Sequence, residues 1–221
     1  MSSSIFGIGI SGMNAAQAGL TTTGHNISNA FTPGFSRQQV VQASSQPQFT
    51  GAGFIGQGVS VSTVKRIYSD TLTGQLTQAQ AQGSQLEAYD ARIKELSNLL
   101  GSASAGLAPA MQDFFGGVAD LASHAESASS RDALLSSANA LAARFQGVDQ
   151  QLTQMRSSIN ADITSSVQTI NSYAQQIASL NRSIVLTESA GTMQPANDLR
   201  DQRDTLVAAL NREVRATVVK G

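Results

Sequence analysis

Residue types that commonly carry out acid–base or metal chemistry are few in this sequence. It has 221 residues, no cysteine and only two histidines, His25 and His124. Asp120 and His124 are four residues apart, so a helix would place both on one face, where they could bind a metal ion or act as an acid–base pair. A solvated ion pair is a far more common role for this spacing. We therefore predict that role for Asp120 and His124.

Three aspartates interleaved with two arginines form a second candidate site. Asp198, Asp201 and Asp204 could bind a metal ion or carry out acid–base catalysis, with Arg200 and Arg203 between them. Acids in the first turn of a helix also complement the helix dipole, and Arg200 stands four residues before Asp204, as an ion pair on one helix face requires. We predict a structural role, in which this helix docks onto a neighbouring part of the protein.

The segment Gly7-Ile-Gly-Ile-Ser-Gly12 matches the GxGxxG fingerprint of dinucleotide-binding proteins. That fingerprint also needs a strand before it and an acid about twenty residues later. No strand fits in the six residues before Gly7, and the first acid is Asp70. The pattern therefore does not predict a nucleotide site, and no serine lies in a nucleophile-elbow motif. We expect no catalytic residue, cofactor site or metal site.

The composition restricts the classes of function further. Charged residues make up 13% of the chain and the formal net charge is -1, so the protein has no global field to hold nucleic acid or an anionic membrane. Low charge suits a surface that neighbouring molecules cover. The absence of cysteine excludes a disulfide framework. No segment resembles a membrane span or a secretory signal, so we expect no membrane insertion and no cleavable signal peptide.

Charge is also unevenly distributed along the chain. Residues 1–69 contain no Asp or Glu and only three bases, Arg37, Lys65 and Arg66, whereas every acid lies from Asp70 onward.

A narrow apolar stripe marks the first predicted helix, between Ile5 and Asn29. Large apolar residues recur there at steps of three, four or seven, namely Phe6, Ile10, Met13, Leu20 and Ile27. Five glycines in the same segment remove about 5 kcal/mol of helix propensity, whereas full burial of the stripe returns at most about 10 kcal/mol. We predict that the segment is loose in the monomer and becomes helical when a partner covers the stripe, which would be a subunit contact.

A turn and an extended arm follow this helix. Pro33 lacks a backbone donor and pushes Thr32 toward an extended conformation, so Phe31-Thr-Pro-Gly-Phe35 ends the helix. The next residues include a glycine-rich tip and then a polar–apolar alternation, which predict an extended β arm or loose hairpin. The tip glycines are Gly51, Gly53, Gly56 and Gly58, and the alternating residues are Val59, Val61 and Thr63.

The rest of the chain is predicted to be mostly helical. A helix with coiled-coil spacing runs from about Asp70 to Leu100 and is ended by Gly101. A shorter helix runs from Pro109 to Leu121. The residues of the coiled-coil seam are Leu72, Leu76, Ala79, Gly83, Leu86, Tyr89, Ile93, Leu96 and Leu100.

A long helix of about 85 Å is predicted from Ser130 to Leu186, with Ser129 or Ser130 as its cap. Its apolar stripe includes a stutter that locally unwinds a supercoil. We expect most of the apolar stripes between residues 70 and 186 to pack inside the chain. The stripe of the long helix comprises Leu134, Ala138, Leu141, Phe145, Val148, Leu152 and Met155, then Ile159, Ile163 and Val167 at the stutter, and finally Ile170, Ala174, Ile177, Asn181 and Ile184.

The last predicted helix is capped by Asn197 and has Leu199, Leu206 and Leu210 on its inner face. Val214, Ala216 and Val218 then alternate with polar residues, as in a strand. Because this strand has nothing to pair with, we expect the natural polypeptide to continue beyond Gly221.

These patterns predict a mainly α protein. We expect an elongated antiparallel helical bundle or coiled coil, with a small extended β arm and a terminal helix that is flexible or part of a coiled coil. The expected domains are an assembly helix over residues 1–35, an extended arm over 36–69, a long-helix bundle over 70–197, and a capped helix with the start of a strand over 198–221.

Two separated motifs resemble those of bacterial flagellar axial proteins. Asn26-Ile-Ser-Asn-Ala-Phe-Thr-Pro-Gly-Phe-Ser-Arg-Gln38 is similar to their amino-terminal signature, and Arg37-Gln38 resembles specifically the hook-associated protein 1 family. Asn197-Asp-Leu-Arg-Asp-Gln-Arg-Asp-Thr-Leu206 is similar to a segment that follows the long helix in that family. Phe31 and Phe35 depart from the family's usual Asn and Tyr. The motif residues are Asn26, Asn29, Thr32, Pro33, Gly34, Phe35 and Arg37 in the first motif, and Asn197, Asp198, Leu199, Asp201, Arg203 and Asp204 in the second.

The resemblance implies a structural subunit that joins hook to filament in the extracellular flagellum. It implies that residues 1 to about 35 form half of an inner coiled coil and that the protein is exported unfolded through the type III apparatus. The implied partners are copies of the protein itself, the hook protein, a second junction protein on the filament side, the export apparatus and a dedicated export chaperone.

Two alternatives remain open at this point. A rod or hook subunit would share the first motif but should lack the long helix from Ser130 to Leu186. A secreted hydrolase using His124 with Asp120 is the alternative from another class.

Overall fold

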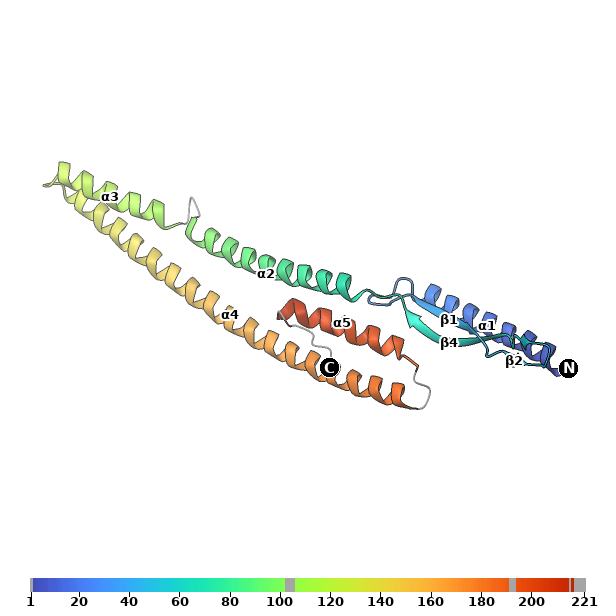
Figure 1. Cartoon of the computed structure of the whole chain (residues 1–221). Coiled ribbons are helices and arrows are strands. Elements are labelled where there is room, and N and C mark those ends of the chain that lie inside the picture. The colour runs from blue at the N-terminus through green and yellow to red at the C-terminus, as the bar shows by residue number, and fades with distance from the viewer. Residues whose placement is uncertain (1, 102–105, 191–193, 215, 217–221) are drawn as a thin grey trace. The chain divides into compact units, whose positions relative to one another are not determined.

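The computed structural model describes residues 2–101, 106–190, 194–214 and 216, which fold mainly as α-helix (Figure 1). The helices are α1 (Ser2–Ser28), α2 (Asp70–Gly101), α3 (Leu107–Ser123), α4 (Ala128–Ser189) and α5 (Asn197–Glu213). The strands are β1 (Gln38–Ser44), β2 (Gln48–Phe49), β3 (Phe54–Ile55) and β4 (Val59–Arg66). The predicted mainly α fold with a small β arm is confirmed. Within the described residues, no helix has the length and apolar character needed to cross a membrane.

The chain divides into two compact units. The first unit comprises residues 1–81 and 170–221, and the second comprises residues 82–169. Helices α2 and α4 each contribute one part to each unit. The division into four segments expected from the sequence stays a prediction.

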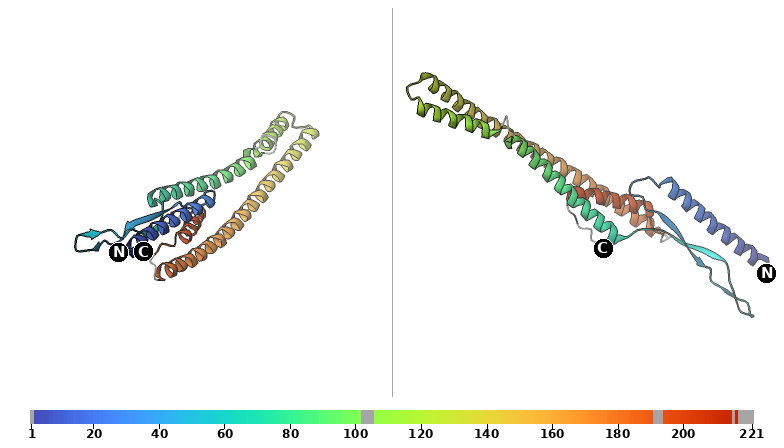
Figure 2. Two further views of the ribbon diagram at one scale, coloured as in Figure 1. Left: turned by 90° about the vertical axis from the view of Figure 1, so that its right-hand side faces the viewer. Right: turned by 90° about the horizontal axis from the view of Figure 1, so that it is seen from above.

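Helix α1 packs against the β hairpin through its small and polar face. Ala15 is buried there, and Ser11, Ala18 and Thr22 on the same face are half-buried. Helix α1 lies alongside β1 and β4, as both Figure 1 and Figure 2 show. The five predicted stripe residues are between 56% and 75% exposed. The chain itself therefore leaves the apolar stripe in contact with solvent, while looseness of this segment in the monomer stays a prediction.

Residues 38–66 form the predicted β hairpin. Strands β1 and β4 pair antiparallel from Gln38↔Arg66 to Ser44↔Val59, with a bulge between Val41 and Gln42. Beyond them β2 pairs with β3 across a tip in which Gly51 and Gly53 have φ of 78° and 138°. Residues that carry a Cβ rarely adopt such positive φ values, which explains why glycine occupies both positions.

The predicted packing of the α2 seam inside the chain is largely wrong. Leu72 and Leu76 are exposed in the first unit, as are Leu86, Tyr89, Ile93 and Leu100 in the second. In the first unit Thr73 and Thr77 are half-buried and Ala81 is buried, and these α2 residues line a pocket together with residues of α4 and α5. Apolar periodicity identifies the stripe, but it does not determine which surface covers the stripe.

Helices α3 and α4 are both confirmed. Helix α3 begins at Leu107, two residues before Pro109, and α4 is continuous over 62 residues. The predicted caps Ser129 and Ser130 lie inside α4, and Ser127 Oγ instead accepts a hydrogen bond from the Ser130 N–H at 3.3 Å. The helix therefore begins earlier than predicted, because Ser127 is the residue that satisfies a free donor of the first turn.

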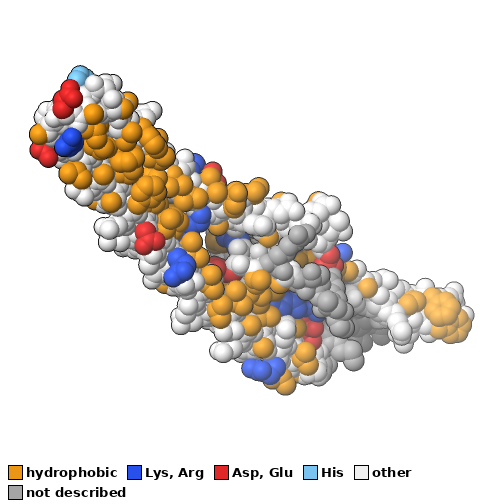
Figure 3. Space-filling model, turned by 90° about the vertical axis from the view of Figure 1, so that its left-hand side faces the viewer, with side chains coloured by type: hydrophobic (Ala, Val, Ile, Leu, Met, Phe, Trp, Pro, Cys, Tyr) orange, Lys and Arg blue, Asp and Glu red, His pale blue; other side chains and the backbone are white. Residues whose placement is uncertain are grey.

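Not every residue of the predicted α4 stripe is covered. In the second unit Phe145, Leu152, Ile163 and Val167 are exposed, whereas in the first unit Ile184 is buried. The stutter rotates the apolar face, so its residues do not all follow one line on the helix. Figure 3 shows hydrophobic side chains gathered over the end of the second unit that α3 and the start of α4 build. The exposed residues there include Met111, Phe115, Val118 and Leu135.

Helix α5 is confirmed, but its predicted cap is wrong. Asn197 is the first helical residue, Ala196 holds the cap position, and no side chain makes a cap hydrogen bond. The Asn197 side chain is buried and has other partners, which are described below. Val214 and Ala216 form no strand, and Val218 of the predicted strand lies outside the described residues.

Candidate functional site

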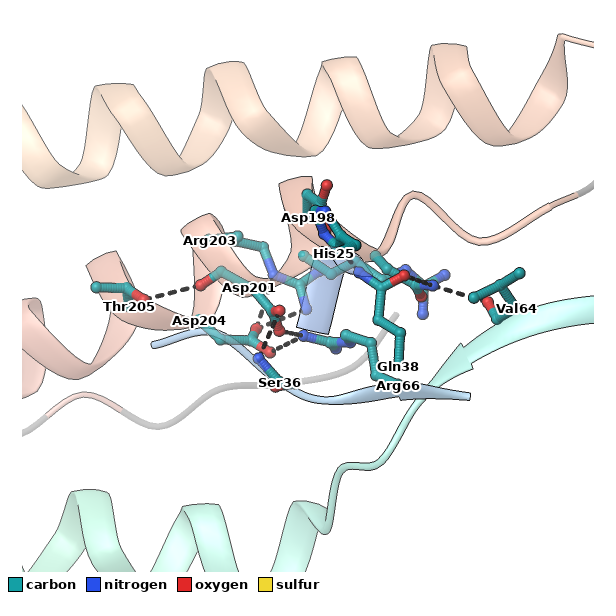
Figure 4. Close-up of polar contacts among 12 residues, drawn as sticks. His25, Ser36, Gln38, Val64, Arg66, Asp198, Asp201, Arg203, Asp204 and Thr205 are labelled. Atoms are coloured by element: carbon teal, nitrogen blue, oxygen red, sulfur yellow. Dashed lines mark hydrogen bonds and ion pairs between the residues drawn. The ribbon is translucent and has the colours of Figure 1, made fainter. Parts of the chain in front are cut away.

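The two sequence motifs, about 160 residues apart, meet in the first unit (Figure 4). The Ser36 N–H donates to Asp201 Oδ2 at 2.8 Å, and Gln38 Nε2 donates to Asp198 Oδ1 at 2.6 Å. Residues 197, 198, 201 and 204 fall at helical spacing, so α5 presents them on one side. We call Ser36, Gln38, Arg66, Asn197, Asp198, Asp201 and Asp204 the polar clamp. It fastens α5 to the turn and hairpin that follow α1.

The centre of the polar clamp is an ion pair with little exposure to water. Arg66 Nη1 lies 2.6 Å from Asp201 Oδ1 and 2.9 Å from Asp204 Oδ2. The Arg66 and Asp201 side chains are only 10% and 8% exposed. Burial alone, the largest single effect, would lower the pKa of the Arg66 guanidinium, but the hydrogen bonds and charge attraction of Asp201 and Asp204 together raise that pKa above its ordinary value. The guanidinium also lies over the Tyr68 ring, 4.6 Å from its centroid.

Asn197 joins α5 to both strands of the hairpin base. Its Nδ2 donates to the Val64 carbonyl at 2.7 Å and to Gln38 Oε1 at 3.3 Å. A buried side-chain amide needs such partners, since an unpaired one costs about 1–3 kcal/mol. This explains why Asn197 is buried and does not cap its helix.

The end of α1 is attached to β1 by a paired amide contact. Asn26 Nδ2 donates to the Gln38 carbonyl and Asn26 Oδ1 accepts from the Gln38 N–H, both at 2.8 Å. This arrangement imitates one rung of a β ladder. His25 adds a second attachment, with Nε2 3.3 Å from Asp198 Oδ1 and its ring edge-on to Phe35 at 5.3 Å. The first motif therefore fixes where α1 ends and β1 begins.

The turn after α1 is stabilised by its own hydrogen bonds and by contact with α5. Asn29 Nδ2 donates to the His25 carbonyl at 3.1 Å, and the Thr32 hydroxyl donates to Asn29 Oδ1 at 3.2 Å. Gly34 has φ of 81°, and a Cβ at this position would lie 2.0 Å from Thr205 Oγ1. Glycine is thus required at residue 34 both for its backbone conformation and for the close approach of α5.

The predicted pairing of Arg200 with Asp204 is wrong. Arg200 forms a two-pronged pair with Glu188 at the end of α4, with nitrogen–oxygen distances of 2.7 and 2.8 Å. The hydrogen bond from Arg200, aided by the Ala196 N–H, lowers the pKa of the Glu188 carboxyl. Asp204 pairs instead with Arg66 and with Arg203, whose Nη2 lies 2.9 Å from Asp204 Oδ1. Arg200 therefore joins α5 to α4, while the aspartates join it to the hairpin.

Most residues of the two motifs come together, and a few take no part in the polar contacts. Arg37 is exposed and Leu199 is half-buried, whereas Pro33 lines a groove beside the turn. The sequence motifs missed Arg66 as a clamp residue, whereas Gln38 is the last residue of the first motif. The charge distribution could have identified Arg66. Residues 1–69 contain no Asp or Glu, so a buried base in this segment can pair only with an acid from later in the chain.

The other candidate chemical sites from the sequence do not form a catalytic, nucleotide-binding or metal-binding arrangement in the described residues. His124 Nδ1 lies 3.2 Å from Asp120 Oδ1, and the two side chains are 64% and 54% exposed, as predicted for a solvated pair. Gly7, Gly9 and Gly12 lie within α1, with no strand leading into a nucleotide loop. Within the described residues, no three His, Asp or Glu side chains are grouped so that they could hold a metal ion.

Comparisons with known proteins agree with the two motifs. The family model of the flagellar hook-associated protein FlgK helical domain matches residues 93–221, and that of the flagella basal body rod protein matches residues 6–35. The chain is 39% identical to flagellar hook-associated protein 1 of Escherichia coli (strain K12) over 216 residues, which cover 98% of this chain and 40% of that protein.

Two further relatives give the same result. The chain is 40% identical to flagellar hook-associated protein 1 of Salmonella typhimurium, covering 98% of this chain and 39% of that protein. It is 30% identical to flagellar hook-associated protein 1 of Bacillus subtilis (strain 168), covering 91% of this chain and 41% of that protein. The chain thus spans about 40% of the length of these relatives. The resemblance found in the sequence is confirmed, and the chain belongs to the flagellar hook-associated protein 1 (FlgK) family.

Proposed function

We propose that this chain is a structural part of the bacterial flagellum, that it joins hook to filament, and that it works by self-assembly and not by catalysis. The observation that carries this proposal is the exposed apolar stripe of α1. Phe6, Met13 and Leu20 face solvent although the opposite face of the same helix packs on the hairpin. An exposed apolar surface along one helix face marks an interaction site.

The polar clamp gives the stripe a defined position. It holds the end of α1, the hairpin and α5 together through paired charges, so that the stripe projects from a fixed base. A fixed base lowers the entropy lost when a subunit binds its neighbours. The clamp is therefore structural in this proposal, and the α1 stripe is the binding surface.

Family membership supports the remaining parts of the proposal. The protein is exported without a cleavable signal peptide and acts in the extracellular flagellum. Its partners are copies of itself, the hook protein, the second junction protein, the export apparatus and a dedicated chaperone. In this proposal residues 1 to about 35 form half of an inner coiled coil.

Neither alternative is favoured by the structure. A rod or hook subunit should lack a long helix corresponding to residues 130–186, and α4 spans Ala128–Ser189. A hydrolase using His124 would need that residue in a cleft, whereas its pair with Asp120 is open to solvent.

Replacing Phe6, Met13 and Leu20 with Gln tests the proposal. Glutamine keeps helix propensity and removes the apolar surface. Because the three changes remove about 5 kcal/mol of burial per subunit, we expect incorporation at the hook–filament junction to fall by more than about tenfold. Immunoblotting of purified flagella measures incorporation, and circular dichroism of the purified chain checks its fold.

The matched control replaces two exposed polar residues beside the stripe on the same helix, Asn14 and Thr21, with Ala. This control should incorporate normally. Normal incorporation of the Phe6, Met13 and Leu20 variant would show that the stripe is not the assembly surface.

A further inference from the structure

An exposed apolar cluster forms the tip of the β hairpin. Phe49, Phe54 and Ile55 are 63%, 73% and 52% exposed. The Phe49 and Phe54 rings lie against each other across β2 and β3, with centroids 5.3 Å apart. The Thr50 N–H and hydroxyl both donate to the Gly53 carbonyl, at 2.9 and 3.0 Å, and close the turn. We call these three apolar residues the hairpin knob, which has a fixed geometry before it meets any partner.

A groove of about 630 Å³ lies beside the polar clamp, where the turn after α1 meets α4 and α5. Its apolar walls are Pro33 and Phe35 from the turn, Leu180 from α4 and Leu206 from α5. Pockets of about 300–1,000 Å³ are the size that receives compact apolar groups. We call this pocket the turn groove. The contacts of Asp201 and Thr205 with the turn hold its walls in place.

The hairpin knob cannot enter the turn groove of its own chain. Gly58, which follows the knob, lies against Ile8 and Ser11 in the first half of α1. The turn groove is lined by His25 and Asn29 at the other end of the helix. The fourteen residue-to-residue steps from Ser11 to His25 span about 21 Å of helix. A knob in this groove must therefore come from a second molecule.

The uncharged knob is electrostatically compatible with the groove, whose charged groups are already paired. Residues 38–64 contain no Lys, Arg, Asp or Glu. The ionisable groups of the groove already have partners within the chain, since Asp201 binds Ser36 and Arg66, and Asp198 binds Gln38 and lies beside His25. An uncharged apolar occupant leaves all these pairs intact. A charged occupant would compete with them and would bury an ion without a partner.

We propose that the hairpin knob of one subunit docks into the turn groove of a second copy of this chain. The proposal rests on the assembly role proposed above and names a second contact within it. Because knob and groove are different surfaces of one molecule, the contact is heterologous and repeats from subunit to subunit, as in a ring or helical array.

The small area buried between knob and groove determines the conditions under which this contact forms. Three partly exposed side chains bury much less than the roughly 800 Å² per partner of a standard stable interface. The contact alone gives no stable dimer in dilute solution. It forms once the α1 stripes hold neighbouring subunits together, because linked sites raise the effective concentration of knob near groove.

The absence of cysteine allows a disulfide test in assembled flagella. The double variant Phe54→Cys/Ser179→Cys places one thiol on the knob and one at the groove, where Ser179 is an exposed lining residue. The control Phe54→Cys/Ser157→Cys places the second thiol at an exposed position of α4 outside the groove. Purified flagella are treated with a mild oxidant and separated on a non-reducing gel. Incorporation is measured separately by immunoblotting of reduced samples.

We expect the knob–groove pair to give a ladder of trimers and larger species, several-fold stronger than the control pair. Normal incorporation without a ladder above the control would overturn the docking contact and leave the proposed function standing. Failure of the unmodified chain to enter flagella would contradict the proposed function itself. A second pair, Phe49→Cys/Gln202→Cys, decides the docking question if the first pair is not incorporated.

Discussion

Replacing Asp201 with Ala is expected to lower the free energy of unfolding by about 3 kcal/mol. The change leaves the buried Arg66 guanidinium with one carboxylate in place of two and leaves the Ser36 N–H without its acceptor. Both losses occur where water has little access, so solvent cannot replace the missing contacts. Urea unfolding followed by circular dichroism measures the effect.

The exposed ion pair between Arg92 and Asp162 provides the matched control. Its side chains are 42% and 57% exposed, so Asp162→Ala should cost less than about 1 kcal/mol. Combining Asp201→Ala with Arg66→Met completes a double-mutant cycle and isolates the pair energy. If Asp201→Ala destabilised the chain no more than Asp162→Ala does, the polar clamp would not be a major source of stability.

Replacing Gly34 with Ala is expected to destabilise the chain by about 3 kcal/mol, from two separate causes. The φ of 81° at Gly34 costs an L-residue about 1–2 kcal/mol. The added Cβ would also lie 2.0 Å from Thr205 Oγ1, and such overpacking costs about 1–3 kcal/mol. The same urea unfolding experiment measures the sum.

Two further variants separate these causes. Gly51 has a similar φ of 78° and no neighbour within 4 Å of its missing Cβ, so Gly51→Ala reports the backbone cost alone. Thr205→Ala in the Gly34→Ala background removes the clashing hydroxyl and should restore part of the stability. If Gly34→Ala and Gly51→Ala had the same effect, the close approach of α5 to the turn would be refuted.

The helices could be predicted from the sequence because their signals are local. Apolar residues at helical spacing lie within the helices they predict, and breakers such as Pro33 and Gly101 lie at or shortly after the helix ends. The observed bounds of α1, α2 and α4 are close to those predicted. The partner that covers each stripe is not a local property. The α2 seam at Leu72 and Leu76 has the right period, yet the chain turns Thr73 and Thr77 inward.

The candidate site was predicted only in part, for the same reason. The motifs identified Asn26, Asp198 and Asp201 as special, but nothing in their spacing showed that they meet. Arg200 stands at the spacing of a helical pair with Asp204, yet a better-oriented carboxylate, Glu188, is available from α4. Competition among partners distant in sequence decides such contacts, and only the folded chain shows the outcome.

A single chain leaves the α1 stripe uncovered, and in the proposed function assembly buries it. Amide hydrogen exchange of residues 5–20 tests this claim most directly, with α5 as the internal reference. We predict rapid exchange in the dilute monomeric chain, well ahead of α5, and strong protection after incorporation into flagella. Slow exchange of residues 5–20 in the dilute monomer, matching that of α5, would contradict the account.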